Sequence, residues 1–281
     1  MIICSSLSDL EQAISSLSND CKIGLVPTMG ALHQGHISLV KTAFKYTDTV
    51  IVSIFVNPVQ FNNPDDLKRY PRTVEADCRL LEDAGTTIVF IPSVEDIYPE
   101  PDNRVFDLGG LDSVGEGPRR PGHFNGVAKV VTRLFDLTKP TYAFFGEKDF
   151  QQLAIIRFFT RQLGYPVEII PCPIFREDDG LAMSSRNTLL DSEQRNAAPA
   201  IYKALSNASR LADQRELSPK ELIGITVREI NSNPYLNSEY VEIVNSLTLQ
   251  PVTGWDEAAG IQMWVAVFAG EIRLIDNIKL K

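Results

Sequence analysis

The sequence KIGLVPTMGALHQGHISLV, residues 22–40, decides the fold class of this chain. It opens with the apolar run Ile23–Val26, which is long enough for a buried strand, and it breaks at Pro27 and Gly30. A helical pattern of apolar residues starts again near Gly35. This order of strand, turn and helix predicts free backbone N–H groups beside the positive end of a helix dipole, an arrangement that binds phosphate.

His33 and His36 lie in this turn, with Gly35 between them. Imidazole can donate a hydrogen bond to phosphate and, when protonated, can offset the charge that develops as pyrophosphate leaves. One alternative is a pair of capping or surface histidines, and another is zinc, because residues with this spacing can share a face. Against zinc, His123 is the only other histidine, and no cysteine or carboxylate has a ligand-like spacing to the pair. We therefore interpret the turn as part of a site for a nucleotide triphosphate.

The composition excludes several broad classes of function. The chain has 281 residues, 44% of them hydrophobic and 22% charged, which is ordinary for a globular protein. Its net charge of −9 argues against broad binding to nucleic acid or to an anionic membrane. The four cysteines form no Cys-x-x-Cys pair, so we expect reduced thiols rather than disulfides or a zinc knuckle. Without a recognisable signal peptide or membrane-spanning stretch, we expect a cytoplasmic protein.

Strands and helices alternate through the N-terminal part of the chain. The apolar, β-branched run Thr49–Phe55 is typical of a central parallel strand. The alternation predicts a doubly wound α/β domain with a parallel sheet. The predicted strands are 23–26, 49–55, 87–91, 142–145 and 167–170, the predicted helices are 6–19, 74–84, 127–137 and 150–163, and 92–124 is irregular.

The pattern changes after Cys172 and Pro173. Residues 191–231 read as two helices with a break at 216–219, and β-rich runs follow at 239–244 and 261–275. Gly270 suits a hairpin turn between strands. This half of the chain predicts a smaller α+β domain.

Two further polar segments contain groups that could bind substrate or phosphate. The amides of Asn57 and Gln60 can bind hydroxyl and carboxylate groups, although Asn-Pro also favours a turn held by its own side chains. In Gly146–Asp149, Lys148 could reach phosphate oxygens, and nearby carboxylates could orient it or hold hydrated Mg²⁺. Asp149 alone could equally be an N-cap. A lysine at the positive end of a helix is unfavourable without an anion, which favours a binding role.

The segment Met183–Asn187, MSSRN, combines two hydroxyl groups with one guanidinium. Arginine can bind phosphate oxygens through two N–H groups, and hydroxyl groups can add neutral donors. A simple N-cap before the helix predicted at 191 explains the serines equally well. Both interpretations stay open at this point.

The chain resembles the pantothenate synthetase (pantoate–β-alanine ligase) family, within the HIGH-type nucleotidyltransferases. Seven segments carry the resemblance, in the order and at the spacing of that family: PTMGALHQGH, FVNPVQF, YPRT, RPGHFNGV, FGEKDFQQ, DGLAMSSRN and RLIDN. The resemblance implies a Rossmann-like domain over residues 1–176, a smaller domain over 177–281 that closes over the active site, and a homodimer. It implies condensation of pantoate with β-alanine, with ATP as co-substrate and Mg²⁺ as cofactor, through a pantoyl adenylate.

The resemblance also implies roles for individual residues. The catalytic set would be His33, His36, Lys148 and Arg186, and the substrate-binding set would be Asn57, Gln60 and Gln152. The nucleotide would be bound by Met29, Gly30, Ala31, Leu32, His33, Gln34, Gly35, His36, Gly146, Glu147, Lys148, Asp149, Phe175, Met183, Ser184, Ser185 and Arg186. No metal ligand is identified. Two positions depart from the expected family pattern: Phe175 replaces a smaller aliphatic residue, and Lys129 replaces a threonine.

Two other functions remain as alternatives. Another HIGH-type nucleotidyltransferase would keep the two histidines but would make a nucleotide-linked product and would not need Gln60 and Gln152. A regulatory module would bind nucleotide without turnover. A Rossmann dehydrogenase is disfavoured, because the turn after the first predicted strand lacks G-x-G-x-x-G.

Overall fold

In the computed structural model of the chain, the apolar run TVIVSI forms strand β3 (Thr49–Ile54), and every residue of this strand is buried. A strand that is buried along its whole length requires cover on both faces of its sheet. The prediction of a central parallel strand is therefore confirmed. The structure describes the backbone of residues 1–281 and every side chain except that of Asp66.

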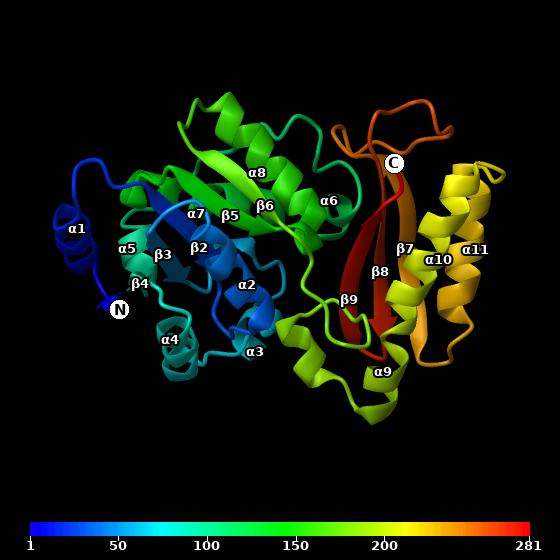
Figure 1. The fold of residues 1–281 in the computed structure, drawn as a ribbon, viewed down its shortest axis with the longest axis horizontal. Coiled ribbons are helices and arrows are strands. Elements are labelled where there is room, and N and C mark those ends of the chain that lie inside the picture. The colour runs from blue at the N-terminus through cyan, green and yellow to red at the C-terminus, as the bar shows by residue number, and fades with distance from the viewer. The chain divides into compact units, whose positions relative to one another are not determined.

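The chain folds into two units, each with its own sheet (Figure 1). The first consists of Met1–Asp112, Glu116–Glu147 and Gln152–Pro173, and the second of Ser113–Gly115, Lys148–Gln151 and Ile174–Lys281. The boundary after residue 176 that the sequence suggested stays a prediction. Within the described residues, no helix combines the length and the apolar character that crossing a membrane requires.

The first unit contains a parallel sheet of six strands in the order β1-β4-β3-β2-β5-β6. This arrangement confirms the predicted doubly wound α/β fold. One strand was missed, the edge strand β1, because three residues with two exposed side chains carry no periodic signal. The other strands, besides β3, are β2 (Ile23–Thr28), β4 (Ile88–Phe90), β5 (Tyr142–Gly146) and β6 (Glu168–Cys172), and β1 is Ile2–Cys4.

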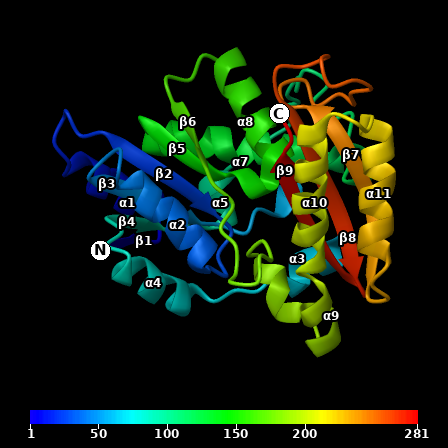
Figure 2. The same ribbon diagram turned by 45° about the vertical axis from the view of Figure 1, so that its right-hand side comes forward.

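Helices cover both faces of this sheet. The chain runs in one direction across the sheet from β2 to β4 and in the other from β4 to β6, so right-handed crossovers place the connecting helices on opposite faces. Figure 2 shows α2 on one face and α7 on the other. The helices are α1 (Leu7–Ser15), α2 (Gln34–Ala43), α3 (Pro64–Arg69), α4 (Val74–Asp83), α5 (Val94–Ile97), α6 (Glu116–Arg119), α7 (His123–Thr138) and α8 (Phe150–Gln162), with 3-10 turns η1 (Pro58–Gln60) and η2 (Glu147–Asp149).

Strand β2 continues through Pro27, where the sequence predicted a break. It pairs with β3 as far as Thr28, but with β5 only at Gly24 and Leu25. The Thr28 carbonyl accepts the Phe55 N–H of the chain after β3, so Pro27 faces the other side, where the β5 ladder has already ended. A proline is tolerated in this strand because no ladder hydrogen bond is required of it there.

The second unit packs two long helices against an antiparallel sheet of order β7-β8-β9. The predicted hairpin at Gly270 is confirmed, since Ala269 pairs with Ile272 across a two-residue turn in which Gly270 has a φ of 60°. The region predicted as two helices contains a third short one, α9. The elements are η3 (Ser185–Leu189), α9 (Ser192–Ala197), α10 (Ala200–Gln214), α11 (Pro219–Asn231), β7 (Leu236–Asn245), β8 (Ile261–Ala269) and β9 (Ile272–Lys279).

Candidate active site

The predicted site residues of the first unit follow strands that meet where the strand order reverses. Strand β2 has β3 on one side and β5 on the other. The order in which the chain adds strands therefore reverses between β2 and β5. Ligands of open parallel sheets bind beyond the carboxyl ends of the strands at such a point. Met29–His36 follows β2, Asn57–Gln60 follows β3, and Gly146 ends β5. The fold therefore brings these segments to one edge of the sheet.

The turn after β2 is held by a buried carboxylate that the sequence did not reveal. Gly30 and Ala31 have positive φ angles of 81° and 50°. Asp77, on α4, accepts the N–H of Ala31 at 3.0 Å and that of Leu32 at 2.8 Å. It is only 1% exposed and also accepts the Thr73 hydroxyl at 3.0 Å. The prediction that the turn offers free N–H groups to phosphate is therefore wrong for these two amides, whose donors are occupied by Asp77.

The two histidines cap the helix that follows the turn. His33 is the N-cap of α2, and its Nδ1 accepts the Gly35 N–H at 3.1 Å. His36 Nδ1 accepts the His33 N–H at 3.3 Å, which completes a capping box built from two imidazoles. The ring centroids are 4.1 Å apart. The capping interpretation of this pair is confirmed.

Capping also determines what chemistry the histidines can perform. An Nδ1 atom that accepts a hydrogen bond cannot carry the proton, so a neutral ring holds its proton on Nε2. Each of His33 and His36 therefore has an Nε2–H donor in a fixed orientation at the positive end of the α2 dipole. A cap and a phosphate donor are thus two roles of one side chain and do not exclude each other.

The amide of Gln60 is oriented by Asn57. The Asn57 Oδ1 accepts the Val59 N–H at 3.3 Å, and its Nδ2 donates to the Gly126 carbonyl at 3.0 Å. Because these backbone partners fix the Asn57 amide, its Nδ2 also donates to Gln60 Oε1 at 3.1 Å. The Nε2 of Gln60 points elsewhere, with the Met29 sulfur at 2.9 Å. Gln60 is therefore oriented as a donor, which suits a carboxylate or a hydroxyl ligand.

Asn57 itself has no hydrogen-bonding capacity to spare for a ligand. Its side chain is 1% exposed and makes four hydrogen bonds inside the protein, the last of them from the Tyr98 hydroxyl at 2.9 Å. The turn held by its own side chain is confirmed in the Asn57–Val59 hydrogen bond. Its place in the site is to orient Gln60.

His123 was predicted to lie in a loop, and this prediction is wrong. It is the first residue of α7, which begins four residues earlier than the predicted Val127, and it is 5% exposed. Its Nδ1 lies 2.9 Å from the Gln60 carbonyl oxygen. One turn later, a Cβ on Gly126 would lie 2.7 Å from the Gln60 Cα, so only glycine permits this approach. Tertiary contact with η1 thus fixes the start of the helix.

Lys148 lies in the 3-10 turn η2, which runs directly into α8. Asp149 therefore has helical neighbours on both sides and is not the N-cap that the sequence allowed. The Lys148 ammonium is 4.0 Å from the Asp149 carboxylate, and its side chain is 19% exposed. The Lys148 carbonyl accepts the Asn277 side-chain N–H from β9 at 3.0 Å. Gln152 lies half-buried in the first turn of α8, and Gly146 and Glu147 precede Lys148.

The segment Met183–Arg186 belongs to a braced loop of the second unit. Ser184 caps η3 by accepting the Arg186 N–H at 3.3 Å. The serines do not cap the helix predicted at 191, whose N-cap is Asp191. The Met183 N–H donates to the Phe175 carbonyl at 3.0 Å. The side chain of Asn187 donates to Glu177 Oε1 at 2.8 Å. Met183, Ser184, Ser185 and Arg186 are all half-buried.

A partly buried ion pair ties this loop to the last strand. Arg176 donates to both oxygens of Asp276, at 2.7 and 2.9 Å, and its guanidinium lies 3.7 Å from the ring centroid of Tyr202. The next residue along β9 is Asn277, which binds the Lys148 carbonyl. Adjacent residues of β9 therefore support both Lys148 and the loop that carries Arg186. The sequence block RLIDN contained these residues but not this information, because their partners lie about a hundred residues or more away.

Comparison with known proteins places the chain in a family. A family model described as pantoate-beta-alanine ligase matches residues 2–279. The chain belongs to the pantoate–β-alanine ligase family. A pantothenate synthetase of Bacteroides thetaiotaomicron is 49% identical over 282 residues, with 100% of this chain and 99% of the relative covered.

Solved structures of the same family agree over the full chain. Pantothenate synthetase from Thermus thermophilus is 43% identical, with a TM-score of 0.92 and coverage of 100% of this chain and 99% of that one. Pantoate-beta-alanine ligase from Francisella tularensis, complexed with beta-gamma ATP and beta-alanine, is 38% identical, with a TM-score of 0.83 and coverage of 100% and 98%. As a pantoate–β-alanine ligase, this chain is an enzyme that forms pantothenate, and the resemblance seen in its sequence is confirmed.

The ligase has no ready-made metal site among its described side chains. No group of three or more His, Cys, Asp or Glu residues in the described part of the chain could hold a metal ion. The Nδ1 atoms of His33 and His36 are also committed to backbone N–H groups.

Phe175, one of the two departures from the family pattern, is 40% exposed. Its contact with the nucleotide stays a prediction.

Proposed function

We propose that this ligase activates pantoate with ATP, through a pantoyl adenylate, and releases AMP and pyrophosphate. The observation that carries the proposal is the capping of α2 by His33 and His36, since an accepting Nδ1 leaves each neutral ring with Nε2–H as its donor. Such donors suit the charge that develops on phosphate oxygens during adenylyl transfer. The Francisella tularensis relative, complexed with beta-gamma ATP and beta-alanine, supports ATP and β-alanine as substrates.

In the first step, a pantoate carboxylate oxygen attacks the α-phosphorus of ATP, and pyrophosphate leaves from the opposite side. The product is a mixed anhydride, which makes the carboxyl carbon electrophilic. In the second step, the β-alanine amine attacks that carbon, loses a proton, and displaces AMP with the bridging oxygen. Since the protein forms no covalent bond to substrate, positioning and charge stabilisation provide the catalysis.

Each proposed residue has a role in that scheme. His33, His36, Lys148 and Arg186 stabilise the transition state of the first step, and Gln60 and Gln152 hold pantoate. The donor orientation of the Gln60 amide supports this assignment, because pantoate offers carboxylate and hydroxyl acceptors. Asn57 contributes through Gln60. The nucleotide is bound by Met29–His36, Gly146–Asp149, Phe175 and Met183–Arg186.

Mg²⁺ enters this proposal with the nucleotide. It prefers phosphate oxygens and water, and it usually needs only one or two carboxylates from the protein. This preference is consistent with described residues that contain no cluster of three ligands. We include in the same proposal a division at residue 176, with residues 177–281 closing over the substrates, and a homodimer. The four free cysteines support a reducing, cytoplasmic setting.

Isotope exchange tests the adenylate directly. With pantoate, ATP and Mg²⁺ but no β-alanine, labelled pyrophosphate is expected to enter ATP, because the first step is reversible. Oxygen-18 in the pantoate carboxylate should then appear in AMP after β-alanine is added. Exchange that requires β-alanine, or release of ADP and phosphate, would overturn the proposal. A persistent nucleotide-linked product would favour the nucleotidyltransferase alternative.

Substitution of the two glutamines tests pantoate binding. Gln60→Ala and Gln152→Ala are each expected to raise the KM for pantoate roughly 10- to 100-fold, the cost of losing a hydrogen bond to a charged group. The KM for ATP should change much less. Gln162→Ala is the matched control, because Gln162 lies exposed at the end of the same helix as Gln152. Equal effects on both substrates would count against the assignment.

A further inference from the structure

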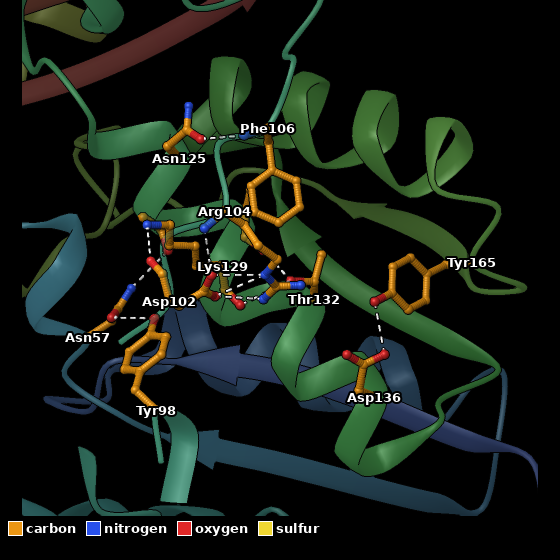
Figure 3. A network of polar contacts seen from close by, with 12 residues as sticks. Asn57, Tyr98, Asp102, Arg104, Phe106, Asn125, Lys129, Thr132, Asp136 and Tyr165 are labelled. Carbon is orange, nitrogen blue, oxygen red and sulfur yellow. Dashed lines mark hydrogen bonds and ion pairs between the residues drawn. The ribbon is translucent and has the colours of Figure 1, made fainter. Parts of the chain in front are cut away.

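Residues 98–106 form a segment that runs across α7 and that we call the strap. Polar contacts join it to α7 at several places (Figure 3). The ammonium of Lys129 donates to the Asp102 carbonyl at 2.6 Å. The backbone N–H of Phe106 donates to Asn125 Oδ1 at 2.7 Å. Since Asn125 and Lys129 are both on α7, the helix holds the strap at two points along its length.

A charge cluster fixes the middle of the strap. The Arg104 guanidinium donates to both carboxylate oxygens of Asp102, through Nε at 3.0 and 3.1 Å and through Nη2 at 2.7 Å. These hydrogen bonds are the main cause that lowers the pKa of Asp102 below its ordinary value. Arg104 also reaches the Thr132 hydroxyl on α7 at 3.4 Å. Two cationic side chains therefore join α7 and the strap near Asp102. Arg104 reaches from the strap to α7, and Lys129 reaches from α7 to the strap.

The first residue of the strap reaches the site. The Tyr98 hydroxyl donates to Asn57 Oδ1 at 2.9 Å, and the Tyr98 ring packs near Phe55 with centroids 6.3 Å apart. Burial raises the pKa of Tyr98 above its ordinary value, so the hydroxyl keeps its proton and remains a donor. At the other side of the same amide, Asn57 Nδ2 donates to Gln60 Oε1. Tyr98 is thus connected to Gln60 through a single side chain.

We propose that Tyr98, anchored by the strap, is a positioning residue for Gln60 and thereby sets the affinity for pantoate. The proposal rests on the proposed role of Gln60 in binding pantoate. Without the tyrosine hydroxyl, the Asn57 Oδ1 keeps only the Val59 N–H, at the longer distance of 3.3 Å. The Asn57 amide then has more rotational freedom, and so does the Gln60 amide that it orients. Binding pantoate must order a more mobile group, which weakens affinity.

Lys129 departs from the family pattern, and the sequence indicated no role for it. Its contact with the strap indicates one. Lys129 joins α7 to the strap at Asp102, the residue whose carboxylate binds Arg104. Its amine donates to the Asp102 carbonyl, and its charge also contributes to the lowered pKa of the Asp102 carboxyl. Lys129→Met keeps an unbranched side chain as far as Cε and removes this hydrogen bond. In this proposal that variant weakens pantoate affinity in the same direction as loss of the Tyr98 hydroxyl, but less.

The experiment compares Tyr98→Phe with Tyr165→Phe. Both variants remove one tyrosine hydrogen bond from the first unit, but the Tyr165 hydroxyl donates to Asp136 at 2.9 Å and not to Asn57 (Figure 3). Tyr98→Phe is expected to raise the KM for pantoate roughly three- to tenfold, the loss of one hydrogen bond, with the KM for ATP unchanged. Tyr165→Phe should leave both constants unchanged. A Tyr98→Phe enzyme with normal pantoate KM overturns the proposal.

A double-mutant cycle separates this proposal from the one on which it rests. In a Gln60→Ala background, Tyr98→Phe should have no further effect on the pantoate KM, because its only route to pantoate is gone. An effect as large as in the wild-type background would show that Tyr98 acts by another route and would overturn the positioning role. If Gln60→Ala alone leaves the pantoate KM unchanged, the binding role of Gln60 fails first. Thermal unfolding of each variant, including Lys129→Met, identifies any general loss of stability.

Discussion

His36→Asn is expected to reduce pantoate-dependent ATP–pyrophosphate exchange about 10²- to 10³-fold, the usual effect of removing one preorganised donor to a developing charge. The reason lies in the two nitrogen atoms of the ring. His36 Nδ1 accepts the His33 N–H, whereas Nε2–H is the proposed donor to phosphate. An asparagine Oδ1 occupies the place of Nδ1 and can keep the cap, but it has nothing at the place of Nε2.

Two other substitutions at this position make the test specific. His36→Gln places an amide N–H near the position of Nε2 and should recover part of the exchange. His36→Ala removes both functions, so it should lose exchange and also about 1 kcal/mol of capping energy. The melting temperature of His36→Asn should stay within about 2 °C of the parent, since the cap is kept. Near-normal exchange in a folded His36→Asn enzyme would exclude His36 from catalysis and leave it as a cap.

Asp77→Ala is expected to destabilise the first unit by about 3 kcal/mol, because it leaves buried donors without an acceptor. Those donors are the N–H groups of Ala31 and Leu32 and the Thr73 hydroxyl. The loss should also reach the site. Ala31 has a φ of 50°, a conformation that costs a non-glycine residue roughly 1–2 kcal/mol and that Asp77 holds in place. Once released, the turn before His33 can relax, and the KM for ATP should rise.

Chemical unfolding and ATP saturation measure the two effects separately. Asp83→Ala is the matched control, because Asp83 is exposed at the end of the same helix and carries the same charge. Its stability should stay within about 0.5 kcal/mol of the parent. Asp77→Asn is not expected to rescue the loss, since its NH₂ group would face a backbone N–H donor. A stable Asp77→Ala protein with a normal ATP KM would show that the turn holds its shape without this carboxylate.

The parts of the fold that could be predicted are those that depend on a local pattern of residues. The run TVIVSI is β-branched at every position except Ser53 and predicted a buried strand, as β3 is. The hairpin turn at Gly270 follows in the same way from one residue that tolerates positive φ. Strand β1 was missed because three residues at a sheet edge, two of them exposed, show no such pattern.

The candidate site was predictable as a set of segments but not as a set of contacts. The histidine turn and the glutamine loop were both recognised from their residue types. The contacts that hold these two segments in place were not recognised, because Asp77 is 45 residues from Leu32 and Tyr98 is 41 residues from Asn57. A buried carboxylate on an amphipathic helix looks like any other polar residue in sequence. Only the fold shows that its acceptors face a turn of another segment.

Pro27 lowers the energetic cost of binding a ligand at this edge of the sheet. Strand β2 and strand β5 share a ladder only at Gly24 and Leu25, and the proline has no N–H to extend it. A ligand that binds where the strand order reverses therefore displaces no backbone hydrogen bond between these two strands. The separation is already present before binding, at a position where rearranging a parallel sheet would be costly. A single imino acid keeps this edge of the sheet preorganised.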